Sequence, residues 1–165
     1  MRVFPIHLQP NKLRFLCVAL LCLFLTSPKA HADEWGMNFY GFSYHETRSY
    51  SDSEGRETKW NEVNPGVGLN HVFHQKGRIE FFHEEAFYQD SQKRTAWYVI
   101  GGGKYRFAPS FQLGAATGGF TSSNLANYGL GFLFIASWHQ ESVIYHLAIP
   151  LKHQVAAFYV TFKLE

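Results

Sequence analysis

The part of this chain that is expected to fold has no cysteine. Its only two cysteines, Cys17 and Cys22, lie within residues 1–32. These residues have the pattern of an export signal: a basic start, the apolar stretch FLCVALLCLFLT and a small-x-small triplet, AHA, at 30–32. We therefore predict that residues 1–32 are a signal peptide and that residues 33–165 form the mature domain. Without cysteine, that domain has no disulfide, no cysteine metal site and no cysteine nucleophile.

The mature domain also lacks an excess of positive charge. Four of the 15 Lys and Arg residues lie in the signal, but none of the 13 acidic residues does. The remaining 11 basic residues face 13 acidic ones, so the formal charge changes from +2 to −2. Because binding to nucleic acid depends on clustered Lys and Arg, this balance argues against a nucleic-acid partner.

No stretch after residue 32 has a convincing helical periodicity. Instead, apolar and polar side chains alternate in runs of about 9 to 12 residues. Each run has the length of a tilted transmembrane strand. The predicted strands are 37–46, 61–74, 78–89, 96–106, 111–121, 128–138, 143–151 and 154–164. Tight turns are predicted at 74–77, 107–110 and 139–142, and longer polar loops at 46–60, 90–95 and 122–127. This alternation is typical of periplasmic turns and extracellular loops.

The aromatic content supports a barrel in a membrane. All four Trp, all nine Tyr and 13 of the 16 Phe residues belong to the mature domain. A small soluble domain must hide such rings, whereas a barrel in lipid displays them on its outer face. We therefore predict an all-β, eight-stranded antiparallel transmembrane β-barrel in the outer membrane of a Gram-negative bacterium. A periplasmic β-sandwich or lipocalin-like barrel is the soluble alternative, but the rings occupy too many positions to fill one small core.

Counting the predicted strands places three residues of the types used in acyl transfer at the same rim of the barrel. His45 ends the first predicted strand, Asp90 and Ser91 follow the third, and both strands run outward. A histidine can take a hydroxyl proton, a carboxylate can orient it, and a serine can act as a nucleophile or donor. An Asp-Ser pair is also a common turn, so the residue types alone leave both interpretations open.

Five short segments occur in order along the mature domain. They are AHADEW (30–35), WNEVNPGVGL (60–69), FYQDSQKRTAWYVIGGGKY (87–105), FQLGAATGGFT (111–121) and AIPLK (148–152). Together they resemble the PagP family, the outer-membrane lipid A palmitoyltransferases. The resemblance implies that His45, Asp90 and Ser91 are required for activity, with His45 as general base, Asp90 as its orienting partner and Ser91 assisting.

The resemblance also implies the reaction and its partners. A palmitoyl-type chain would pass from a glycerophospholipid to lipid A of lipopolysaccharide in the outer leaflet, which modifies the barrier against cationic antimicrobial peptides. No cofactor and no metal are expected, and the expected state is a monomer.

An enzyme of this kind needs an apolar pocket in the lumen. The candidate lining residues are Gly102, Gly114, Gly118, Gly129, Gly131 and Leu133. Glycines that face the lumen leave room for methylene groups, or they only relieve crowding in a small barrel. Both interpretations stay open.

The lower lumen is expected to be polar. A period of two that turns Asp90 inward also turns Glu80 and Glu84 inward, and Lys104 and Arg106 reach the same end. We predict structural ion pairs there, because an unpaired buried charge is costly.

Two other functions remain open at this point. One is a non-enzymatic small barrel that supports envelope integrity or binds surface ligands. The other is a lipid A deacylase. Hydrolysis and transfer differ only in whether water or a sugar hydroxyl reaches the acyl carbon, so residue types do not separate them.

Overall fold

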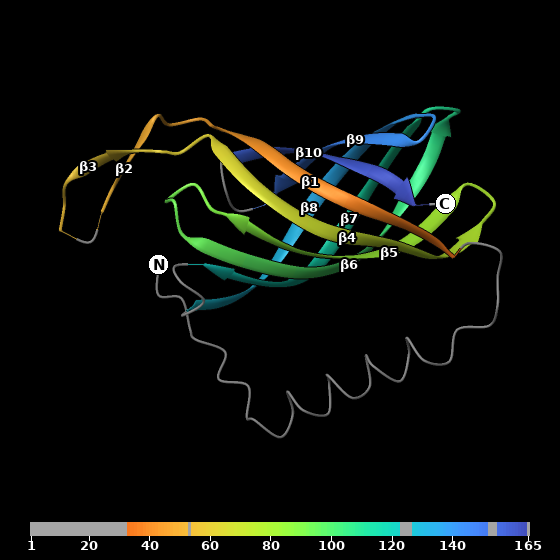
Figure 1. Ribbon diagram of the computed structural model, residues 1–165, viewed down its shortest axis with the longest axis horizontal. Coiled ribbons are helices and arrows are strands. Elements are labelled where there is room, and N and C mark those ends of the chain that lie inside the picture. The colour runs from red at the N-terminus through yellow and green to blue at the C-terminus, as the bar shows by residue number, and fades with distance from the viewer. Residues whose placement is uncertain (1–32, 53, 123–126, 152–154, 165) are drawn as a thin grey trace, which may run out of the picture. The chain divides into compact units, whose positions relative to one another are not determined.

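The computed structural model describes residues 33–52, 54–122, 127–151 and 155–164. Eight long strands are β1 (Glu34–His45), β4 (Val63–Lys76), β5 (Ile79–Gln89), β6 (Thr95–Ala108), β7 (Phe111–Ser122), β8 (Asn127–Gln140), β9 (Val143–Pro150) and β10 (Val155–Leu164). They form a closed antiparallel barrel in chain order, in which β1 pairs with both β4 and β10 (Figure 1). The predicted all-β, eight-stranded barrel is confirmed, and each predicted strand end lies within three residues of the observed one.

The side chains alternate between the two faces of the barrel wall. Large apolar residues such as Phe42, Phe87 and Leu130 are exposed on the outside, whereas Phe82 and Ile135 are buried in the lumen. An apolar outer face is typical of a barrel that meets lipid. Among the described residues, no helix is long and apolar enough to cross a membrane.

A β-bulge at Gly41 changes which face of β1 points inward. The register with both neighbouring strands shifts at this residue. Before the bulge, Asn38 and Tyr40 point into the lumen; after it, Ser43 and His45 do. A strict period of two would have placed Ser43 and His45 on the outer face. The bulge therefore turns the predicted base into the lumen.

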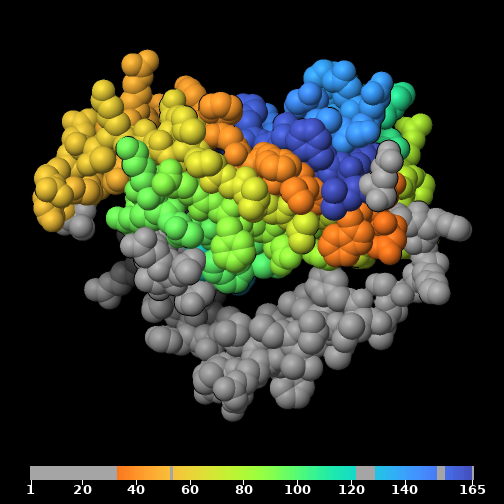
Figure 2. Space-filling view, in the orientation of Figure 1, coloured from red at the N-terminus to blue at the C-terminus, as the bar shows by residue number. Residues whose placement is uncertain are grey.

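The predicted long polar loop between β1 and β4 contains a small hairpin that the sequence did not predict. Its strands are β2 (Ser49–Ser51) and β3 (Glu57–Lys59), and Figure 2 shows this segment projecting beyond the barrel. The turn is organised by Asp52, whose carboxylate accepts hydrogen bonds from the backbone N–H groups of Glu54 and Arg56 and from Arg56 Nε. These donors, the Arg56 backbone N–H above all, hold the pKa of Asp52 below its usual value.

The barrel has two distinct ends. The turn end carries the tight connections β4–β5, β6–β7 and β8–β9, and the loop end carries the hairpin together with the C-terminal ends of β1 and β5. These names are used below.

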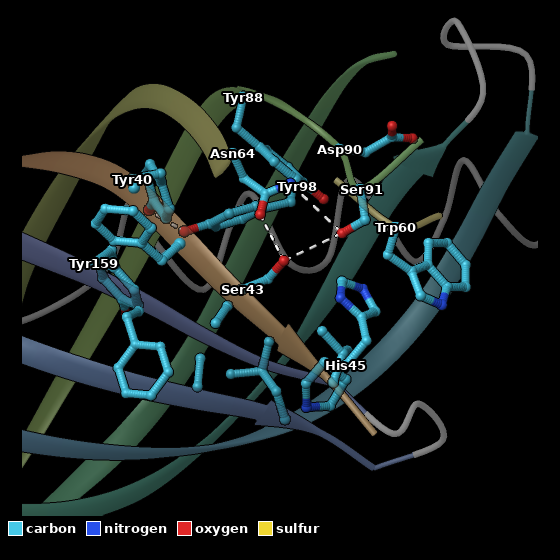
Figure 3. Close-up of a pocket in the computed structure, with 18 of the residues that line it drawn as sticks. Tyr40, Ser43, His45, Trp60, Asn64, Tyr88, Asp90, Ser91, Tyr98 and Tyr159 are labelled. Carbon is cyan, nitrogen blue, oxygen red and sulfur yellow. Dashed lines mark hydrogen bonds between the residues drawn. The ribbon is translucent and has the colours of Figure 1, made fainter. Parts of the chain in front are cut away.

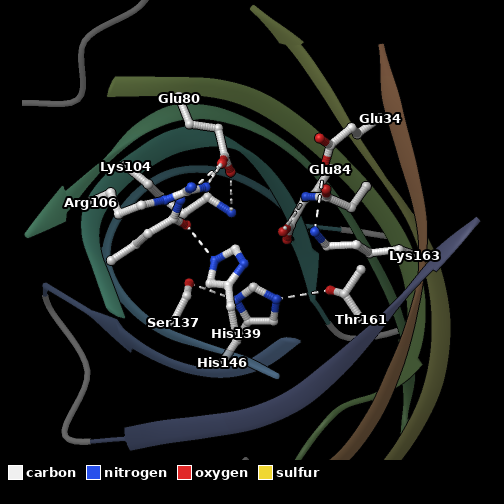
Figure 4. Close-up of polar contacts among 12 residues, drawn as sticks. Glu34, Glu80, Glu84, Lys104, Arg106, Ser137, His139, His146, Thr161 and Lys163 are labelled. Atoms are coloured by element: carbon white, nitrogen blue, oxygen red, sulfur yellow. Dashed lines mark hydrogen bonds and ion pairs between the residues drawn. The ribbon is translucent and has the colours of Figure 1, made fainter. Parts of the chain in front are cut away.

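The predicted ion pairs fill the lumen near the turn end (Figure 4). Lys104 Nζ lies 3.1 Å from Glu80 Oε1, and Arg106 Nη2 lies 3.7 Å from Glu80 Oε2. Gln112 Nε2 also donates to Glu80 Oε2 at 2.9 Å. The Lys104 side chain is 1% exposed and that of Glu80 is 7% exposed, so the charges of Lys104 and Glu80 are paired where water hardly reaches them.

Candidate active site

The loop-end half of the lumen contains a cavity of about 660 Å³. Its wall is largely apolar and includes Ile100, Leu133, Ala148, Val155 and Ala157. Polar side chains of β1, β4 and the connection after β5 gather at its mouth, as Figure 3 shows. The volume falls within the range of small-molecule sites, roughly 300–1,000 Å³. An apolar chain with a polar end group matches this arrangement.

Tyrosine rings close the floor of the cavity. Tyr40 and Tyr159 stack with their ring centroids 4.9 Å apart, and the Tyr40 hydroxyl is hydrogen-bonded to that of Tyr98. Tyr98 and Tyr159 donate to the buried Glu84 carboxylate at 3.2 and 3.1 Å, and Asn70 Nδ2 donates to it at 2.8 Å. Because the hydroxyl groups are bonded within the floor, the cavity meets mainly ring carbon. The floor separates the apolar cavity from the polar network below it.

His45 lies at the mouth of the cavity. The His45 residue is 9% exposed, and its Nδ1 is buried without a hydrogen-bond partner among the described residues. The imidazole stacks on the indole of Trp60, with centroids 4.7 Å apart and an interplanar angle of 9°. A buried ring nitrogen without a partner is costly, which is typical of a site that a ligand completes.

Ser91 belongs to a polar cluster that the sequence did not reveal in full. Ser43 Oγ donates to Asn64 Oδ1 at 2.6 Å and lies 3.3 Å from Ser91 Oγ. Asn64 Nδ2 lies 3.5 Å from Ser91 Oγ and also donates to the Gln89 carbonyl at 3.1 Å. Ser43 and Asn64 were not predicted. Ser43 faces the lumen only because of the bulge, and the sequence pattern gives no sign that Asn64 lies beside it.

Asp90 lines the same cavity, but its carboxylate serves its own loop. Asp90 Oδ1 accepts hydrogen bonds from the backbone N–H groups of Gln92 and Arg94, both at 2.8 Å. In Figure 3 it lies beyond Ser91 as seen from His45, and no hydrogen bond joins Asp90 to His45 in the described chain. His45 and Ser91 thus line the same cavity, and the printed hydrogen bonds of the Asp90 carboxylate are those of its own turn.

Of the six predicted pocket residues, Leu133 is in the cavity wall and the five glycines are not. A Cβ added at Gly102, Gly114 or Gly118 would lie 2.0–2.4 Å from a backbone oxygen of the neighbouring strand. At Gly131 it would lie 2.5 Å from the Phe120 ring, and at Gly129 it would meet nothing within 4 Å. Four of the glycines therefore permit close packing of the wall, which is the second of the two interpretations offered by the sequence.

Comparisons with known proteins identify the fold. Neither a scan of protein-family models nor a search of curated protein sequences gives a match. A solved transmembrane β-barrel designed de novo has a TM-score of 0.54 and 10% identity, covering 84% of this chain and 100% of that chain. The outer membrane protein Ail of Yersinia pestis has a TM-score of 0.50 and 9% identity, covering 80% of this chain and 99% of that chain. At these identities the likeness shows the fold alone, which is that of an eight-stranded transmembrane β-barrel.

Proposed function

We propose that this protein is an outer-membrane acyltransferase that moves a palmitoyl-type chain from a glycerophospholipid to lipid A in the outer leaflet. The observation that carries the proposal is the position of His45. At the mouth of an apolar cavity, which is also lined by a cluster of hydroxyl and amide groups, its buried Nδ1 has no hydrogen-bond partner in the part of the chain that the structure describes. A site built for a surface ligand alone has no need of a base in that place.

The geometry suggests a role for each group. The acyl chain of the donor lies in the cavity with its ester carbonyl at the mouth. His45 takes the proton from a lipid A hydroxyl as that oxygen attacks the carbonyl carbon. Ser91 and Asn64 donate hydrogen bonds to the negative oxygen that develops. When the ester bond breaks, the proton held by His45 passes to the departing glycerol oxygen, and a lysophospholipid leaves.

The resemblance to the PagP family supports the same reaction. The resemblance implies that His45 and Ser91 correspond to the essential histidine and serine of that family, and both line the cavity. The Asp90 position of the family is present, but its carboxylate bonds its own loop here. Export by residues 1–32, an outer-membrane location, a monomeric state and an effect on cationic antimicrobial peptides complete the proposal.

The decisive experiment is mass spectrometry of lipid A from cells that express the protein. We expect a mass gain of one long acyl chain, which His45→Ala and Ser91→Ala each reduce by at least about 100-fold. His74→Ala is the matched control, because His74 lies in the turn-end part of β4, where it packs on Phe81. Barrel folding is checked for each variant by the mobility difference between boiled and unboiled samples.

Other results would point to other functions. A loss of mass from lipid A would replace the transferase with a deacylase. Unchanged lipid A in cells with folded protein, donor phospholipid and acceptor present would leave the non-enzymatic barrel.

A further inference from the structure

Three rings form a stack that joins the hairpin to the cavity mouth. The His45 imidazole lies almost parallel to the Trp60 indole, and the Tyr50 ring stacks on the same indole with centroids 4.2 Å apart and an angle of 28°. Tyr50 belongs to β2, and the Trp60 backbone N–H donates to the Arg48 carbonyl at 3.3 Å. Two rings of the stack, Tyr50 and Trp60, therefore belong to the segment between β1 and β4, whereas His45 ends the wall strand β1.

Among the described residues, no carboxylate accepts a hydrogen bond from Nδ1 of the His45 imidazole. In hydrolytic triads a carboxylate accepts a hydrogen bond from the ring and stabilises the imidazolium that forms. Here Nδ1 of His45 has no partner among the described residues. Asp90 is committed to its loop. The remaining acidic neighbour, Glu62, interacts with the ring only at a distance, through its charge.

We propose that Trp60 is the positioning residue for His45 and takes over both tasks of the missing carboxylate. Its flat contact fixes the plane of the imidazole. Its π-face stabilises the positive charge that the ring acquires when it takes the acceptor proton, because a cation over an indole is attracted to the ring. Tyr50 backs the indole and makes the orientation of His45 depend on a folded hairpin. The inference rests on the proposed function and adds a residue that acts through His45.

The contact itself is tested without any activity. The barrel with ¹³C-labelled histidine is folded in detergent micelles, and the ring signals of His45 are assigned with His45→Ala. We expect the ring protons to be shifted upfield by the indole, and Trp60→Leu to abolish the shift. Trp138→Leu is the matched control, since Trp138 stacks on Tyr145 and is 45% exposed on the outer face.

The catalytic consequence is tested by kinetics on the same samples. We expect Trp60→Leu to lower kcat by about threefold to thirtyfold, the range of a cation–π contact, with KM unchanged. Trp60→Phe should restore most of kcat, Tyr50→Leu should give an intermediate loss, and Trp138→Leu should have no effect.

Each failure has a separate meaning. His45 signals without an upfield shift in the wild type overturn the stack, and a Trp60→Leu variant with wild-type kcat overturns the positioning role. An increase in KM alone would make Trp60 a binding residue and would also overturn it. A wild-type barrel that transfers no acyl chain overturns the proposed function and the catalytic part of this inference. The upfield shift of the His45 ring protons still decides, independently of activity, whether Trp60 holds the imidazole.

Discussion

At the scale of single residues, Asp90 has two possible roles, that of a turn former and that of a catalytic carboxylate, and a substitution can distinguish them. We predict that Asp90→Asn retains acyl transfer within about threefold, because an amide oxygen still accepts the two backbone N–H groups of the loop. When a carboxylate does orient a catalytic histidine, the same change costs about 10⁴ in kcat. Initial transfer rates of the purified variant decide the matter. A loss of 100-fold or more in a folded barrel would return Asp90 to the role that the family resemblance implied.

Glu84 makes the opposite case, a buried carboxylate with a structural role. It is 0% exposed and accepts hydrogen bonds from Asn70, Tyr98 and Tyr159. Glu84→Ala leaves these donors unpaired, so we predict a decrease of about 3–5 kcal/mol in the free energy of unfolding, measured with urea in lipid vesicles. Glu85→Ala, on the exposed outer face next along β5, should not lower it. Equal effects of the two changes would contradict the floor described above.

At the scale of elements, the bulge in β1 decides which side chains reach the cavity. We predict that deleting Gly41 removes the bulge and leaves Ser43 facing the lumen, because strict alternation from Tyr40 then places Phe42 outside and Ser43 inside. Because residues 33–165 contain no cysteine, a spin label on Ser43→Cys reports the facing directly. Its accessibility to oxygen, which dissolves in lipid, should stay low on deletion, and that of a label on Phe42→Cys should stay high. A rise at Ser43 together with a fall at Phe42 would mean that Gly41 is not the extra residue of the strand.

The same element shows what the sequence could and could not predict. Alternation over eight runs located the strands, and a period of two correctly turned Glu80 and Glu84 inward, since these features depend only on local pattern and burial. The bulge at Gly41 could not be predicted, because a single glycine in a strand has no periodic signature. The hairpin was missed for a related reason: β2 and β3 have three residues each. The cluster of Ser43 and Asn64 joins residues 21 apart in the chain, which only the bulged register brings together.

At the scale of the whole molecule, one half of the lumen stabilises the barrel and the other half contains the proposed binding cavity. Paired charges and the tyrosine floor fill the turn-end half, whereas the loop-end half keeps an apolar cavity that contributes little packing. Leaving such a space empty costs packing energy, and a barrel without a ligand would gain by filling it. A change that fills the cavity should therefore leave the barrel at least as stable while it impairs the reaction.

Ala148 is the position at which the effect of filling the cavity on acyl transfer can be measured. It is 8% exposed, lies in the cavity wall and pairs with Ile135 and Ala157. We predict that Ala148→Phe lowers the transfer of palmitoyl chains by about tenfold to 100-fold, because the ring occupies space that the chain needs, and that shorter chains become the preferred substrate. Competition between phospholipids of defined chain length, followed by mass spectrometry of lipid A, measures the preference, and Ala115→Phe on the outer face is the control. If Ala148→Phe lowered the rate equally for all chain lengths, the cavity would not hold the acyl chain, even if His45 and Ser91 proved essential.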